Sequence, residues 1–275
     1  MTSTGDKEAN LATAARLVAD AVAQGAELVV LPEMFNCLGS GAVLQAGAEP
    51  LDGPTSAWSA AVAAEHGIHL VAGSFIERDA DADADVDEGA GDRRRNHNTS
   101  CVYGPGGARL AVYRKIHLFD VEVPGAEFHE SAAIAPGDEV VVADAGALRL
   151  GLNICYDLRF PEVFRIQALR GATAVTVPAA FTAKTGPPHW EVLLRARAIE
   201  NQVFVIAAGQ RGTSAGALAW HGHSMIIDPW GTVLAEAPDE EGVIVADLDL
   251  AEQARVRSIL PSLENRRPGT YEWPS

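Results

Sequence analysis

The order of strand-like and helix-like segments constrains the fold of this chain most. One series runs as strand, helix, strand and hairpin from Glu27, and a second series in the same order begins at Leu148. Two such halves predict two sheets packed face to face with helices outside, which is an α/β, four-layer αββα sandwich. Because no low-complexity linker separates the halves, we expect a single domain over residues 1–275.

Apolar periodicity and turn residues place the individual elements of this sandwich. Helices are expected from Asp6 to Gly25 and over residues 54–66, 161–169 and 188–201. Strands are expected over residues 27–31, 68–75, 99–103, 108–114, 140–142, 148–154, 173–177, 203–208, 224–227 and 243–248. Residues 78–95 show no periodicity, and positions 79–92 carry seven acidic residues, so we expect a flexible acidic loop there.

Charge and cysteine content exclude several classes of partner. A formal net charge of −16 argues against nucleic acid and anionic membrane. No apolar run is long enough to span a bilayer, and the first residues do not resemble a signal peptide. Three widely spaced cysteines predict no disulfide framework, and together these features favour the cytoplasm.

Three short segments place a reactive side chain at the end of an apolar run: Glu33, Lys115 and Cys155. Together they provide a general base, a cation for an oxyanion and a nucleophile, as hydrolysis of an amide through a covalent intermediate requires. Each residue also has a structural alternative. Cys155 could be a small core residue, Glu33 a helix cap or exposed turn acid, and Lys115 a solvated strand flank.

The surrounding motifs decide between these interpretations. Residues 155–162 match C-Y-D-x-R-F-P-E, and residues 114–120 match R-K-x-H-L-F-D. With Glu, Lys and Cys in this order at separations of 82 and 40 residues, the chain resembles the nitrilase superfamily of carbon–nitrogen hydrolases. Motifs after residue 185 look most like the Nit-type amidases, the branch that contains deaminated-glutathione amidase and ω-amidase.

This resemblance implies the roles of base, cation and nucleophile for the three residues, and it implies further site residues. The resemblance marks Glu130 as a second carboxylate, which would orient Lys115 and the attacking groups. The backbone N–H of Tyr156 would be the second oxyanion donor. Arg159 is similar to an arginine that meets a substrate carboxylate in related carbamoylases, although an ion pair with Glu162 or another acid is an equal alternative.

The predicted activity is that of a cofactor-free cysteine-dependent amidohydrolase. It would cleave a small, carboxylate-bearing amide through a thioester and release ammonia. A nitrilase, an N-carbamoyl amidohydrolase or an inactive binding scaffold remain alternatives. The pair His221 and His223 lacks a third ligand, so we expect no metal, and we expect Cys37 and Cys101 to be structural thiols. The resemblance further implies a homodimer or a higher homo-oligomer.

The beginning of the chain departs from the superfamily pattern. Its members open with a buried strand, whereas this chain reads Met1-Thr2-Ser3-Thr4 directly before a helix. We therefore expect the first strand to be missing. The natural protein would then start upstream of Met1, or this form would be less stable than one with the strand restored.

Overall fold

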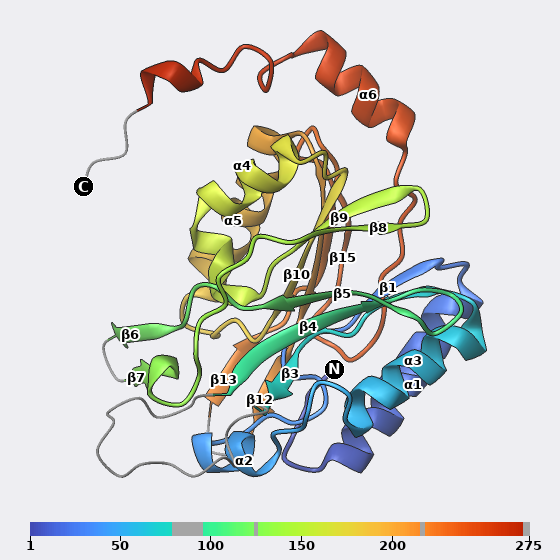
Figure 1. Cartoon of the computed structure of the whole chain (residues 1–275), viewed down its shortest axis with the longest axis vertical. Helices are drawn as coiled ribbons and strands as arrows, with labels where there is room; N and C mark the ends of the chain where they lie inside the picture. Colours follow the sequence, from blue (N-terminus) through green and yellow to red (C-terminus); the bar gives the residue numbers. More distant parts are fainter. Residues whose placement is uncertain (79–95, 124–125, 215–217, 272–275) are drawn as a thin grey trace.

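The computed structural model (Figure 1) describes residues 1–78, 96–123, 126–214 and 218–271. The acidic loop predicted over 78–95 lies outside this description except for its first residue.

Two sheets form the centre of the molecule. The first has the order β1-β2-β4-β3, with β5 also paired to β4. Its strands are β1 (Leu28–Val30), β2 (His69–Val71), β3 (Phe75–Glu77), β4 (His97–Tyr103) and β5 (Arg109–Arg114). The second has the order β15-β14-β11-β10-β9-β8. Its strands are β8 (Val142–Ala145), β9 (Leu148–Leu152), β10 (Ala174–Ala179), β11 (Phe204–Gly209), β14 (Met225–Ile227) and β15 (Val233–Glu236).

Helices and two small hairpins complete the described elements. The hairpins are β6 (Asp120–Val123) with β7 (Ala126–His129), and β12 (Arg211–Ser214) with β13 (Leu218–His221). The α-helices are α1 (Lys7–Ala23), α2 (Gly41–Ala46), α3 (Pro54–His66), α4 (Pro161–Leu169), α5 (Gly186–Asn201) and α6 (Leu250–Ile259). Three short 3₁₀ turns are η1 (Glu130–Ala132), η2 (Cys155–Arg159) and η3 (Pro268–Thr270).

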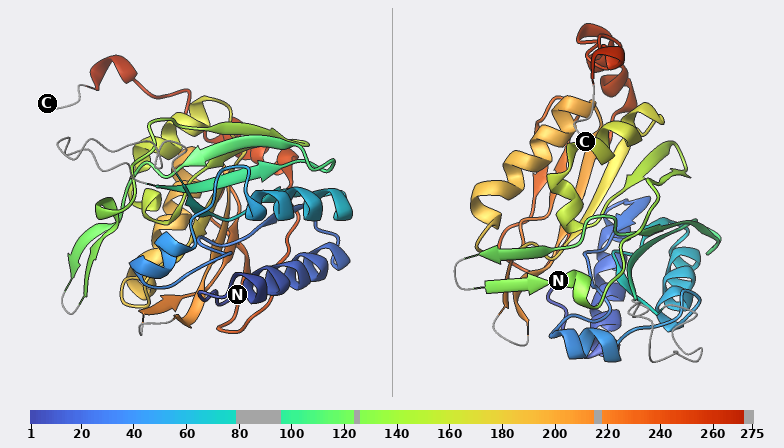
Figure 2. Two further views of the ribbon diagram at one scale, coloured as in Figure 1. Left: turned by 60° about the horizontal axis from the view of Figure 1, so that its bottom comes forward. Right: turned by 60° about the vertical axis from the view of Figure 1, so that its left-hand side comes forward.

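The predicted four-layer sandwich is confirmed. Helices α1 and α3 cover the outer face of the first sheet, and α4 and α5 cover the outer face of the second (Figures 1 and 2). One apolar core joins the sheets, because Val102 and Tyr113 of the first pack with Leu152 and Val175 of the second. This shared core supports the single domain over 1–275, which stays a prediction.

Local signals set several boundaries as predicted. The side chain of Asp6 accepts a hydrogen bond from the Ala9 N–H and begins α1. Helix α3 begins with Pro54 in its first turn and ends at Gly67, whose φ of 64° is a left-handed conformation that glycine adopts without strain. Strand β10 is buried at every position, as expected for the centre of a parallel arrangement with β9 and β11.

The strand predicted over residues 68–75 is wrong as one element, because it is interrupted between Val71 and Phe75. Gly73 lies in the interruption with φ 45°, and a Cβ there would lie 2.0 Å from the carbonyl oxygen of Pro32. The two chain segments therefore approach too closely for any side chain. This approach positions the segment that carries Glu33.

Other strand predictions need correction too. The strand predicted over 140–142 begins only at Val142, as β8. Residues 243–248 were predicted as a strand from their apolar pattern, but they form no strand and belong to no sheet. Helices α2 and α6, strand β15 and the two small hairpins were not predicted from the sequence.

The first residues of the chain bind the segment at residues 210–211, where β12 begins. Residues 1–5 form no strand. The Met1 carbonyl accepts a hydrogen bond from the Arg211 N–H, and the Ser3 N–H donates to the Gln210 side chain. Among the described strands, β1 stands at the edge of its sheet. No helix in the described part of the chain is long and apolar enough to cross a membrane.

Candidate active site

Glu33 lies just after β1 and is 4% exposed. One carboxylate oxygen, Oε1, accepts hydrogen bonds from Asn98 Nδ2 at 2.9 Å and from Lys115 Nζ at 3.1 Å. The other, Oε2, accepts the Ala180 N–H at 2.7 Å. Ala180 follows β10, so this carboxylate joins the two sheets. Because this carboxylate is buried and accepts three hydrogen bonds, Glu33 is a functional or paired acid and not an exposed acid in a turn.

Lys115 follows the last residue of β5 and lies between two carboxylates. Besides Glu33, its Nζ contacts Glu130 Oε1 at 3.1 Å and Oε2 at 2.8 Å. Glu130 begins η1 and also accepts the Phe119 N–H at 2.7 Å. Burial alone would lower the pKa of Lys115, but Glu130 and Glu33 outweigh it and hold that pKa well above the ordinary value. Lys115 is thus a buried, permanently charged cation and not a solvated flank.

Cys155 lies at the turn where β9 gives way to η2. Its φ of 47° is a left-handed conformation, which is uncommon for a residue with a side chain and is found at strained functional turns. Burial raises the pKa of the Cys155 thiol well above its ordinary value, and the charge of Glu33 raises it further, while Lys115 lowers it. The thiol therefore stays protonated until a base removes its proton.

The carboxylate of Asp157, which is fully buried, holds this turn in place. It accepts hydrogen bonds from the Ile154 N–H at 2.8 Å and the Tyr113 hydroxyl at 2.6 Å. It also accepts the His117 N–H at 3.1 Å and the His117 ring Nδ1–H at 2.7 Å. Asp157 thus fastens the end of β5, which carries the lysine, to the turn that carries Cys155. In the sequence this residue lies within a family motif, which did not predict a role for it.

Arg159 lies on aromatic rings beside the turn. Its guanidinium carbon is 5.2 Å from the Phe181 ring centroid and 5.8 Å from that of Tyr156. Its Nη1 donates to His189 Nδ1 at 3.2 Å. Within the described ranges Arg159 makes no salt bridge, so the expected alternative of an ion pair with Glu162 is not observed. The oxyanion role of the Tyr156 N–H stays a prediction.

The remaining candidates from the sequence are two cysteines and two histidines. Cys37 and Cys101 are free and buried, and burial raises the pKa of Cys101 to about 12. His221 and His223 stack with ring centroids 4.5 Å apart, and His223 Nδ1 lies 2.8 Å from a carboxylate oxygen of Glu236. Among residues 1–78, 96–123, 126–214 and 218–271, no three His, Cys, Asp or Glu side chains are grouped so that they could hold a metal ion.

Comparison with known proteins identifies the family. The family model described as carbon–nitrogen hydrolase matches residues 1–258. The chain belongs to the carbon–nitrogen hydrolase family. One relative is the omega-amidase NIT2 of Mus musculus, which is 41% identical over 267 residues that cover 96% of this chain and 92% of the relative.

Solved structures of this family have the same fold. Nit3 of Saccharomyces cerevisiae, a member of branch 10 of the nitrilase superfamily, matches with a TM-score of 0.85 and 32% identity, covering 98% of this chain and 93% of that chain. A mutant of the amidase from Nesterenkonia sp. AN1 matches with a TM-score of 0.75 and 28% identity, covering 98% of this chain and 94% of that chain. The structure of that mutant shows the result of Michael addition of acrylamide at its active-site cysteine.

In this carbon–nitrogen hydrolase, the structure brings Glu33, Lys115 and Glu130 into direct contact and places the Cys155 thiol within the electrostatic influence of the first two. The residues that sequence reasoning missed are those that hold the cluster from outside it, chiefly Asp157 and Asn98. No sequence signal indicated Asn98, because the strand was predicted over 99–103, whereas β4 begins at His97.

Proposed function

We propose that Glu33, Lys115 and Cys155 hydrolyse the carbon–nitrogen bond of a small linear amide. The enzyme is a cysteine-dependent amidohydrolase, and the observation that supports these three roles is the buried contact of base and cation beside the thiol. Lys115 Nζ lies 3.1 Å from Glu33 Oε1, and both act on the pKa of Cys155. Measurement of ammonia released from a panel of ω-amides tests this activity.

The first half-reaction forms a thioester. Glu33 takes the thiol proton as Cys155 Sγ bonds to the amide carbon, and the carbonyl oxygen becomes an oxyanion beside Lys115 and the Tyr156 N–H. Glu33 returns the proton to the nitrogen, the carbon–nitrogen bond breaks, and ammonia leaves. Each oxyanion donor of this kind contributes about 3–4 kcal/mol to stabilising the transition state.

The second half-reaction uses the same groups in reverse. Glu33 removes a proton from water as the water oxygen bonds to the thioester carbon. The carbon–sulfur bond then breaks, the carboxylic acid leaves, and the proton on Glu33 returns to Cys155. Glu130 keeps Lys115 charged and oriented throughout, because it provides two of the three contacts of Nζ.

The substrate is proposed to carry a carboxylate besides its amide. Arg159 supports this, because its guanidinium is spread over two aromatic rings and has no acid partner within the described ranges. The mammalian relatives are named omega-amidases, and an omega-amide of a dicarboxylic acid has this chemistry.

A matched pair of substrates tests the role of Arg159. The change Arg159→Ala should raise KM for an ω-amide with a free carboxylate by about 10-fold or more, as expected for losing a charge-assisted hydrogen bond, and should leave KM for its methyl ester nearly unchanged. Arg159→Lys, which keeps the charge, is the control. Equal effects on both substrates would contradict carboxylate binding. Release of ammonia from nitriles, or of ammonia with CO₂ from carbamoyl compounds, would indicate the alternative activities.

Assembly into a homodimer or higher homo-oligomer is part of this proposal. Exposed apolar side chains on α4 and α5 support it: Ile166, Leu169, Val192 and Ile199. Residues 260–271 also extend away from the sheets (Figure 1). Light scattering of the protein and of a Val192→Glu variant tests this assembly. The cytoplasm stays the proposed location, supported by three free cysteines.

A further inference from the structure

Asn98 contacts both carboxylates of the site, as Lys115 does. Its Nδ2 donates to Glu33 Oε1 at 2.9 Å and to Glu130 Oε1 at 3.2 Å. A side-chain amide has two N–H donors, so each carboxylate takes one of them. The backbone carbonyl of Asn98 also accepts the Lys115 N–H at 2.9 Å. Asn98 thus contacts the proposed base, the cation and the second carboxylate.

The Asn98 amide is held in the interior of the first sheet. Asn98 is the second residue of β4 and lies opposite Ile76 of β3. Its side chain is fully buried, and its own oxygen, Oδ1, has no hydrogen-bond partner within the described chain. A buried acceptor without a donor opposes folding, and leucine would fill the same space without that cost. What asparagine offers here over leucine is therefore its pair of donors.

The carboxylate of Glu130 has no free site for a proton. An ionised carboxylate has about four lone-pair sites, two on each oxygen. On Glu130, Oε1 accepts from Asn98 Nδ2 and from Lys115 Nζ. Its Oε2 accepts from Lys115 Nζ and from the Phe119 N–H. All four sites are thus taken, and a proton could bind only by displacing one of these donors.

The carboxylate of Glu33 differs by one site. Its Oε1 is filled in the same way, by Asn98 Nδ2 and Lys115 Nζ. Its Oε2 accepts the Ala180 N–H, and the second site on Oε2 has no N–H donor within the described chain. This site can take the proton of the Cys155 thiol, which is close enough for the charge of Glu33 to raise its pKa. Without Asn98, a further site would open on Oε1 of each carboxylate.

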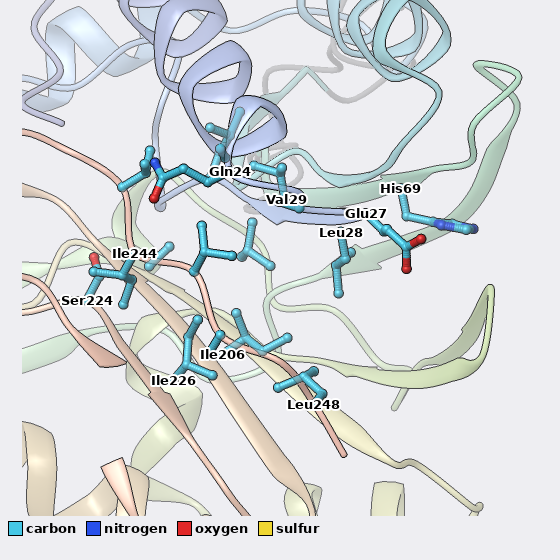
Figure 3. Close-up of a pocket in the computed structure, with 18 of the residues that line it drawn as sticks. Gln24, Glu27, Leu28, Val29, His69, Ile206, Ser224, Ile226, Ile244 and Leu248 are labelled. Carbon is cyan, nitrogen blue, oxygen red and sulfur yellow. The ribbon is translucent and has the colours of Figure 1, made fainter. Parts of the chain in front are cut away.

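The large cavity of the molecule does not reach these oxygens. A cavity of about 680 Å³ lies between the sheets, where Leu28 of the first sheet and Ile206 of the second face it (Figure 3). Neither Asn98 nor either of the two carboxylates is among its lining residues. Water in that cavity therefore does not change which hydrogen bonds the carboxylates accept.

We propose that Asn98 is a positioning residue that selects which carboxylate acts as the base and which of its oxygens takes the proton. By filling one site on each carboxylate, it leaves Oε2 of Glu33 as the open acceptor beside the thiol. Its donors also stabilise the excess negative charge of two carboxylates that share one ammonium, without neutralising it. This inference rests on the proposed function, in which Glu33 is the base.

A matched pair of buried asparagines tests this role. Asn98→Leu keeps the volume and removes both donors. Asn201→Leu is the control, because the fully buried Asn201 amide on α5 also donates to two acceptors, the Arg197 carbonyl at 3.0 Å and Glu200 Oε1 at 3.4 Å. Asn98→Leu should lower kcat for an ω-amide by roughly 10²-fold, as expected for a misplaced general base, and should change KM little. Asn201→Leu should keep nearly wild-type kcat even if its Tm falls as far.

The pH profile of kcat separates positioning from a loss of structure. A donor to an ionised carboxylate favours the ionised form, so a carboxylate that loses this donor binds a proton at higher pH. The acidic limb of the profile should therefore move to higher pH in Asn98→Leu and stay in place in Asn201→Leu. The titratable groups next to the amide are Glu33, Glu130 and Lys115, with the Cys155 thiol beside them. Lys115 stays charged over this range, because the two carboxylates hold its pKa well above the ordinary value.

Each outcome supports or overturns the role of Asn98. Asn98→Ala removes the same donors without bulk and is used if leucine prevents folding. Wild-type kcat in a folded Asn98 variant, or equal loss of kcat in Asn201→Leu, would overturn the proposal. Unfolding of both Asn98 variants beside a folded Asn201→Leu would overturn it too, because Asn98 would then serve the fold. Turnover by Glu33→Gln would instead show that the proposed base is wrong, whereas an inactive Glu33→Gln beside active Asn98 variants would refute only this inference.

Discussion

The change Asp157→Asn removes half of the acceptor capacity that holds the turn carrying Cys155. The carboxylate accepts four hydrogen bonds, from Tyr113, from Ile154 and twice from His117. An asparagine of the same size keeps one oxygen and turns an NH₂ group toward two of these donors. Each buried donor left without an acceptor costs about 1–3 kcal/mol. The expected loss is therefore about 2–6 kcal/mol, a large part of a typical unfolding free energy of ~5–15 kcal/mol.

Activity should fall with stability, because the left-handed conformation of Cys155 depends on this anchor. A displacement of about 1 Å at the thiol costs roughly 10²-fold in rate, so kcat should fall much more than KM changes. Urea unfolding and steady-state kinetics measure the two effects. Tyr113→Phe is the control, since it removes one donor and leaves the carboxylate with three, at a cost of about 1 kcal/mol. Wild-type stability and kcat in Asp157→Asn would refute the positioning role.

The other predictions concern the charges and thiols of the site. Glu33→Gln should abolish turnover. It should also lower the pKa of Cys155, because the carboxylate charge raises that pKa. Alkylation by iodoacetamide should therefore begin at a lower pH than in wild type, and an unchanged pH profile would contradict this. Lys115→Ala should slow turnover by roughly 10²-fold or more and move the alkylation profile to higher pH; wild-type kcat would remove Lys115 from the mechanism. Cys37→Ala and Cys101→Ala should keep nearly full turnover, and rapid alkylation of Cys37 in a labelling map would argue against Cys155 as the reactive thiol.

The sequence predicted those parts of the fold and site that local signals determine. Gly67 and Pro54 set the ends of α3 because one tolerates a positive φ and the other cannot donate a hydrogen bond within a helix. Glu33 and Lys115 each follow an apolar run, and a buried strand places its next residue at the edge of the sheet. Their contact across 82 residues could be predicted only through the family motifs.

The remaining features depend on contacts that local sequence does not encode. The interruption between β2 and β3 contains Gly73, and the Pro32 carbonyl oxygen lies 2.0 Å from where a Cβ on Gly73 would be, a long-range contact that only the folded chain reveals. Residues 243–248 have the composition of a strand but form none, since a strand needs a neighbour to receive its hydrogen bonds. Asp157 is an ordinary acid in the sequence, and its importance follows only from four donors that converge on it.

Hydrolysis is proposed to pass through a thioester on Cys155. Rapid acid quenching of the enzyme during turnover of an ω-amide, followed by peptide mass spectrometry, tests it most directly. The peptide containing Cys155 should gain the mass of the acyl group, which is the substrate less ammonia, and hydroxylamine should remove this mass. Turnover in which the acyl mass is found on another residue, with the Cys155 peptide unmodified, would contradict a thioester on Cys155.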